Sequence, residues 1–248
     1  MFFNKLLTHH TNRAAGSSGV EAGELADRHQ PARRVKFRIM RKILVVLGLL
    51  AVAALPPAVA APFAVPGQPS EYASLLASLK AGNTAIDYTR LRLSYMDSPE
   101  YKAAKDVSKS EEAMSDELNK KDYPAALKDA QAVLESNYVN IDAHYVALLA
   151  NREMGAMDKA EFHRTVFRGL INSIRNSGDG KSLETAWVVI NVHEEYVMLR
   201  VLGYRPSQQS LVNQKGHSYD VMKVKNAEDG TEQTFYFNVD IPFKHYGF

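Results

Sequence analysis

The sequence contains no cysteine and only one tryptophan among its 248 residues. Without cysteine the chain has no disulfide bonds, no thiol nucleophile and no thiolate ligands for a metal. It also has no cysteine that could carry a lipid anchor after an export signal. The fold must therefore rest on a hydrophobic core alone, and a hydrophobic fraction of 46% is enough for one.

Residues 62–248 also lack a concentration of charge of one sign. Residues 1–61 carry nine basic and three acidic side chains, whereas residues 62–248 carry 21 basic and 25 acidic ones. The net charge of +2 thus comes from the N-terminal stretch, and the larger part has an acidic balance. A nucleic-acid-binding protein needs a concentrated basic face. The mixed charges of residues 62–248 therefore argue against nucleic acid as a partner.

No apolar run reaches the roughly 20 residues that cross a membrane. The clearest run, Ile43–Leu55, has 13 residues, follows two basic residues and is ended by two prolines. Ala58-Val59-Ala60 then ends in the small residues that a signal peptidase accepts. We predict a signal peptide over 40–60, cleaved between Ala60 and Ala61, and a periplasmic or secreted protein without a stable membrane span. An uncleaved membrane anchor is the alternative.

The stretches on either side of this signal have little pattern. Residues 1–39 are polar and show no apolar period, so we expect a disordered leader, which a translation start at Met40 would remove. Residues 61–70 contain three prolines and predict an extended arm.

Residues 71–176 are predicted to be helical. Apolar residues recur at helical spacing and predict helices over 71–81 and 111–120, one that begins at Pro124, and two over 142–154 and 158–174. Ala126 and Ala160 lie 34 residues apart, each early in the second helix of a pair. This spacing resembles a tetratricopeptide unit, although fewer than two full units are visible.

Residues 177–248 are predicted to be the β part of the same domain. Branched and aromatic residues dominate, and the turn at Ala227–Gly230 is typical of a hairpin. We predict an antiparallel meander of about five strands, near 186–193, 196–203, 207–213, 217–225 and 232–239. The fold class is therefore α+β, with N-terminal helical hairpins packed on a C-terminal sheet.

Long ordered strings in the sequence resemble a bacterial family known only as a domain of unknown function, number 4919. The resemblance covers nearly all of residues 70–245 and implies an exported protein with a helical half and a β half. It brings no established activity, substrate or catalytic residue. The strings are IDYTRLRLSY (86–95), SGDGKSLETAWVVI (177–190), EEYVMLRVLG (194–203), QSLVNQKGHSYDVMKV (209–224) and FYFNVDIPF (235–243).

Two arginines are candidate ligand-binding residues. Arg90 and Arg92 are flanked by Tyr88 and Tyr95, and arginine binds carboxylate or phosphate through two parallel hydrogen bonds. In the alternative interpretation the neighbouring leucines are buried and acids of the chain itself pair with the arginines.

Four residues are candidates for a hydrolytic site: Glu195, His217, Asp220 and Asp240. Imidazole and carboxylate groups exchange protons with a substrate or hold a metal. Adjacent strand residues point to opposite faces, so His217 cannot activate its neighbour Ser218 as a nucleophile. If the four meet in one cleft they favour an enzyme, and if they are scattered they favour a binding protein.

The sequence as a whole favours a non-catalytic module that binds or assembles with an envelope protein or peptide. The alternative is a metal-independent or metal-assisted hydrolase with its site between the helices and the sheet. Residues 62–248 contain no pair of histidines at a local ligand spacing, so we predict no metal site and no cofactor.

Overall fold

The computed structural model of the chain describes residues 69–246, which belong to one compact unit. The predicted leader 1–39, the signal peptide 40–60 with its cleavage site, and nearly all of the arm 61–70 lie outside the described residues.

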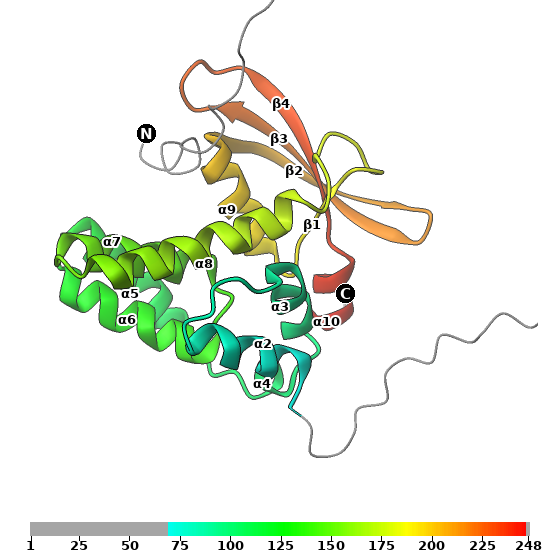
Figure 1. Ribbon diagram of the computed structural model, residues 1–248. Coiled ribbons are helices and arrows are strands. Elements are labelled where there is room, and N and C mark those ends of the chain that lie inside the picture. The colour runs from blue at the N-terminus through cyan, green and yellow to red at the C-terminus, as the bar shows by residue number, and fades with distance from the viewer. Residues whose placement is uncertain (1–68, 247–248) are drawn as a thin grey trace, which may run out of the picture. The chain divides into compact units, whose positions relative to one another are not determined.

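Helices make up the first part of the described chain, as predicted (Figure 1). Short connections join the long helices, so neighbours in sequence pack side by side. Ala126 and Ala160 are both buried, and each is the fourth residue of its helix. The helices are α2 (Glu71–Lys80), α3 (Tyr88–Tyr95), α4 (Pro99–Lys102), α5 (Ser108–Asn119), α6 (Tyr123–Ser136), α7 (Ile141–Glu153) and α8 (Met157–Arg175).

The sheet of the described part has four strands, where the sequence predicted five, in the order β1-β4-β3-β2. Strands β2 (Tyr204–Gln214), β3 (His217–Asn226) and β4 (Glu232–Asn238) form the predicted antiparallel meander. Strand β1 (Trp187–Val188) has only two residues and pairs with β4 in parallel, so the sheet is mixed.

The missing strand is a helix. Residues 196–202 of the segment predicted as strand 196–203 lie in α9 (Val192–Leu202), so that prediction was wrong. Of the predicted strand 186–193 only β1 is a strand, and the last two residues of that segment begin α9. Val197, Leu199 and Val201 are buried, but so is Met198. A helix covered on two sides has a nearly continuous apolar sequence, and periodicity does not distinguish such a run from a buried strand.

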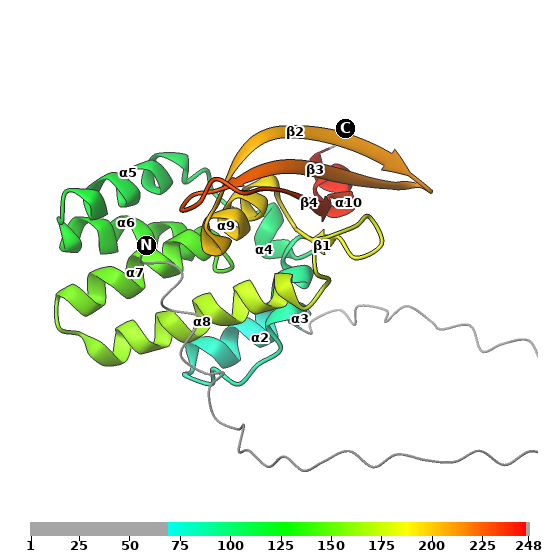
Figure 2. The ribbon, with the colours of Figure 1, turned by 90° about the horizontal axis from the view of Figure 1, so that it is seen from above.

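Helix α9 lies between the sheet and the helical part (Figure 2). It packs under the inner face of the sheet, which carries Asp220, Met222 and Val224 of β3. A last helix, α10 (Asp240–Tyr246), follows β4. Within residues 69–246, every helix is too short or too polar to cross a membrane.

Candidate functional site

Helix α9 carries two buried acids in its first turn, Glu194 and Glu195, which are 3% and 0% exposed. The helix begins here because the side chain of Asn191 accepts the backbone N–H of Glu194 at 3.0 Å. It ends at Gly203, whose φ of 81° suits a residue without a Cβ atom. Successive helix residues point about 100° apart, so the two carboxylates enter different surroundings.

Glu194 is paired with Arg92 of α3, which is fully buried. The guanidinium donates from Nη1 to Glu194 Oε2 at 2.6 Å, from Nε to Ser173 Oγ at 2.6 Å, and from Nη2 to the carbonyl of Val188 at 3.0 Å. The backbone N–H of Ile190 also donates to Glu194 Oε2, at 2.9 Å. This buried pair therefore ties α3, α8, β1 and α9 together.

Close packing of α3 against α8 brings Arg92 to Ser173. The two helices approach at Gly169, where a Cβ atom would lie 2.5 Å from the ring of Tyr88. Ser173 follows Gly169 by one helical turn and so faces the same neighbour. A larger residue at 169 would push α3 away from α8 and lengthen the Arg92 contact.

The second oxygen of Glu194 has no such partner. Oε1 is buried and accepts no hydrogen bond from the residues that the structure describes. Burial raises the pKa of Glu194, while the charge of Arg92 and the N–H of Ile190 oppose that rise. A buried carboxylate oxygen without a donor costs free energy, which the bonds to Oε2 offset in part.

Glu195 meets another acid, Asp220 on the inner face of β3. Asp220 is 7% exposed, and its Oδ2 accepts the side-chain amide of Gln209 at 2.7 Å. Burial, and then the nearby charge of Asp220, raise the pKa of Glu195 to about 9. Glu195 therefore keeps its proton at neutral pH, and neither of its carboxyl oxygens has a hydrogen-bond partner among the described residues.

A cavity of about 340 Å³ lies beside Glu194, where the start of α9 meets the helical part. This volume falls within the range of small-molecule sites. Tyr95 and Met96 bring the end of α3 to its wall, one turn beyond Arg92. The other lining residues are Tyr101, Glu111, Asn137, Val139, Asn140, Ile141, Asn191, Val192, His193, Glu194 and Val197.

The polar part of the wall is acidic. Glu111 of α5 is exposed, and its Oε1 accepts the side-chain amide of Asn140 at 2.8 Å. Together with Glu194 it places two carboxylates on the cavity, and none of the lining residues is a lysine or an arginine. His193 is the only lining residue that gains a positive charge near neutral pH.

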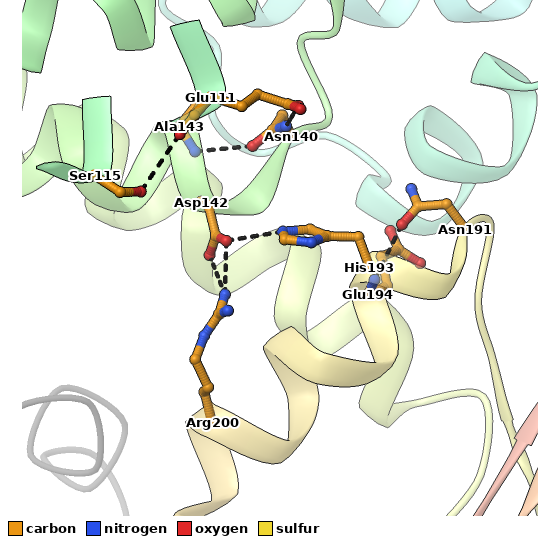
Figure 3. Close-up of polar contacts among 9 residues, drawn as sticks. All are labelled: Glu111, Ser115, Asn140, Asp142, Ala143, Asn191, His193, Glu194 and Arg200. Atoms are coloured by element: carbon orange, nitrogen blue, oxygen red, sulfur yellow. Dashed lines mark hydrogen bonds and ion pairs between the residues drawn. The ribbon is translucent and has the colours of Figure 1, made fainter. Parts of the chain in front are cut away.

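An ion-paired junction next to the cavity fixes α7 to α9 (Figure 3). Asp142 accepts hydrogen bonds from Arg200 at 2.6 Å and from His193 Nε2 at 2.8 Å. The hydrogen bond to Asp142 raises the pKa of His193. Burial raises the pKa of Asp142, but the bonds from His193 and Arg200 outweigh burial and lower it overall.

The other two hydrolase candidates meet at the end of the sheet. His217 Nδ1 and Asp240 Oδ2 are 2.6 Å apart, and the backbone N–H of Ser218 donates to Asp240 Oδ1 at 2.7 Å. Burial raises the pKa of Asp240, but the bonds from Ser218 and His217 outweigh it and lower the pKa. The four candidates therefore form two pairs, Glu195 with Asp220 and His217 with Asp240.

The two arginines suggested as ligand-binding residues lie in different surroundings. Arg90 is exposed and paired with Glu71 at the surface, and its neighbour Arg92 is inside the protein. The four hydrogen-bonding partners of the two guanidinium groups, Glu71, Ser173, Val188 and Glu194, all belong to the chain itself.

Sequence reasoning missed a histidine pair between α7 and α8, in which His144 is fully buried and His163 is half-buried. His144 Nδ1 and His163 Nδ1 are 3.0 Å apart, and His144 Nε2 is 2.9 Å from the carbonyl of Tyr138. A carbonyl only accepts, so Nε2 of His144 carries the hydrogen and His163 donates to Nδ1. Burial lowers the pKa of His144 to about 3 and that of His163 to about 4. Their separation of 19 residues gave no local signal.

Within residues 69–246, no three histidine or carboxylate side chains lie close enough to hold a metal ion. No curated protein and no solved structure matches the chain. The sequence profile of one family, described as Domain of unknown function (DUF4919), matches residues 65–247. Because this match spans well over half of the 248 residues, the chain belongs to the DUF4919 family.

Proposed function

We propose that this chain is an exported, non-catalytic binding module of the cell envelope, and that its ligand occupies the cavity at the start of α9. The export step rests on the apolar segment after Met40 and the small residues at Ala58–Ala60. The helical hairpins α5–α6 and α7–α8 act as a tetratricopeptide-like platform that holds one wall of the cavity.

One observation carries the binding role. A cavity of about 340 Å³ is lined by apolar side chains and by the polar side chains of Glu111, Asn140 and His193. A small molecule in this cavity would gain apolar contacts from the wall and hydrogen bonds from its polar groups.

Hydrolysis has less support from the geometry. Glu195 has the raised pKa of a general acid, but it is fully buried and its partner Asp220 is nearly so, which keeps a substrate away from both. His217 and Asp240 pair with each other at the end of β3 and not with Glu195. The polar groups on the cavity wall are instead arranged to bind.

Localisation is tested by fractionating cells that express the full chain and sequencing the N-terminus of the product. We expect a chain in the envelope fraction that begins at Ala61. An intact 248-residue product in the cytosol would contradict export.

The binding role is tested by native purification from the envelope fraction, followed by denaturation and mass spectrometry of the released molecules. Val192 lies on the cavity wall and is 41% exposed, so Val192→Trp fills the site from its rim. Leu211→Trp is the matched control, because Leu211 is 48% exposed and does not line the cavity. We expect a released molecule from the wild type and the control but not from Val192→Trp. Equal release from all three, or turnover of ester, peptide or phosphate substrates, would overturn the proposal.

A further inference from the structure

We propose that strand β2 pairs with β2 of a second copy of this chain, so that the two sheets join into one across a twofold axis at Leu211. Within residues 69–246, β2 pairs only with β3 and forms one edge of the sheet (Figure 2). This interface is separate from the proposed ligand site, because no residue of β2 lines the cavity at the start of α9.

Strand β2 is a long edge with little protection. It has 11 residues, and all of them except Tyr204 and Val212 are exposed. Edge strands commonly carry charged residues, prolines or bulges that block pairing with another chain. Here Arg205, Pro206 and the bulge that follows Pro206 protect only the first part of the strand. Residues 208–214 contain no charged side chain and no proline.

The hairpin turn fixes which backbone groups of β2 face outward. Lys215 and Gly216, both at positive φ, form a two-residue turn, so Gln214 and His217 close the hairpin as a hydrogen-bonded pair. Hydrogen-bonded and non-hydrogen-bonded pairs then alternate along β2 and β3. Every second residue back from Gln214 therefore bonds to β3, and the residues between them turn their backbone groups to the free edge.

The outward-facing residues are Gln209, Leu211 and Asn213. Each presents one N–H donor and one C=O acceptor along the edge. In a twofold antiparallel pairing with Leu211 opposite its own copy, Gln209 lies opposite Asn213 of the second copy. All three outward-facing residues then fall in hydrogen-bonded pairs, each of which exchanges two hydrogen bonds.

The side chains of this segment also suit a second copy. Leu211 is the middle residue of 208–214 and is 48% exposed. The pairing brings the two leucine side chains next to each other and removes apolar surface from water. Gln208 lies opposite Gln214 of the other copy, and no like charges meet because the segment has none. The bulge and the turn bound the segment, so a shift of this register would shorten the pairing.

Analytical ultracentrifugation tests the pairing on protein purified under native conditions from cells that express the full chain. We expect a dimer at about 100 µM protein, in the micromolar range of weak association. Gln208→Lys/Gln214→Lys places like charges opposite each other across the axis and should weaken the dimer about tenfold, as should Gln208→Glu/Gln214→Glu. An equimolar mixture of the two variants should restore the dimer, because each lysine then meets a glutamate.

Two control variants should dimerise as the wild type does. Asn119→Lys/Gln131→Lys adds the same charge at exposed positions of α5 and α6. Val192→Trp changes only the cavity, which keeps this test apart from the test of ligand binding. Loss of the dimer in either control would contradict pairing through β2.

Amide hydrogen exchange identifies the paired strand. As the dimer forms with rising concentration, the N–H groups of Gln209, Leu211 and Asn213 should become protected, whereas those of Ser210 and Val212 already bond to β3 and should not change.

Three results would overturn the proposal. The first is a wild type that stays monomeric or a dimer in which the three outward-facing amides still exchange freely. The second is protection of these amides in a monomer, which would assign the edge to another segment of the chain or to a bound peptide. The third is a mixture of the two charge variants that does not dimerise, which would exclude the twofold register.

Discussion

Glu194 and Glu195 are adjacent in the sequence, and both are buried, yet the two sides of α9 treat them differently. On the side of α3 and α8, Glu194 meets the guanidinium of Arg92 at 2.6 Å. On the side of the sheet, Glu195 meets the carboxyl group of Asp220. The charge of Glu194 is neutralised by the opposite charge of Arg92, whereas Glu195 is uncharged because it keeps its proton.

The stability of these two arrangements responds differently to mutation and to pH. A buried ion pair loses stability when one partner is removed, because the other charge remains without compensation. A protonated acid is stable while the pH keeps the proton in place, and it becomes costly when the proton leaves. The side of Glu194 is therefore sensitive to mutation, and the side of Glu195 is sensitive to pH.

The largest effect is expected from Arg92→Ala. This change leaves Glu194 buried without its cation, so we expect the free energy of unfolding to fall by about 3–5 kcal/mol. Urea denaturation measures it. Arg90→Ala is the control two residues away, and its exposed pair with Glu71 should contribute less than about 1 kcal/mol. Similar losses of unfolding free energy in both variants would show that the buried pair is no more sensitive to mutation than the exposed one.

Glu195→Gln tests the side of the sheet. Folding raises the pKa of Glu195 from 4.5 to about 9, so the folded state holds a proton that the unfolded state releases. Stability from this group is fully present below pH 4.5 and falls as the pH rises toward 9, by up to about 1.4 kcal/mol per pH unit. The amide of glutamine stays neutral, so the variant should flatten this decline. The exposed Glu228→Gln should leave it unchanged.

The histidine pair between α7 and α8 supplies an acid-sensitive counterpart. Folding lowers the pKa of His163 from 6.5 to about 4, so the stability present above pH 6.5 is lost as the pH falls toward 4. In His163→Asn one titrating group is gone and an amide can still donate to His144. We expect the acid slope to decrease by up to about 1.4 kcal/mol per pH unit. Glu195→Gln should retain the full acid slope, and a loss of it there would show that the two regions are coupled.

The smallest effect concerns the junction at the start of α9. Asp142→Asn should cost about 1–2 kcal/mol and lower the pKa of His193, because Asp142 holds the proton on that imidazole. An NMR titration of His193 measures the second change. Asp158 is the second residue of α8, as Asp142 is of α7, but it is exposed. Asp158→Asn should therefore leave His193 unchanged. An unchanged pKa in Asp142→Asn would contradict the assigned cause.

Local patterns predicted those parts of the fold that depend on neighbours in the sequence. The α+β class, the long helices and the hairpin at Ala227–Gly230 all follow from periodicity and turn residues, and Gly230 has the expected positive φ of 74°. Helix α9 was predicted as a strand because packing on both sides removed its amphipathic period. A helix signal was present in Asn191, Glu194 and Gly203, where a cap, an acid in the first turn and a terminating glycine follow in order.

The candidate site was less predictable than the fold. Glu195 and Asp220 were both candidates, but their pairing depends on a helix packing under a sheet. Glu194 and His193 have no distinctive pattern in the sequence, and the cavity beside them is formed by residues between Tyr95 and Val197. No spacing rule connects residues that are about a hundred positions apart.

The sequence by itself determined the absence of thiol chemistry, the helical first part, the β hairpins and the membership of a family, because composition and local patterns encode these. Only the tertiary structure decided which of two neighbouring glutamates would meet a cation and which an acid. That choice depends on the angle between successive residues on a helix and on the two surfaces between which the helix packs.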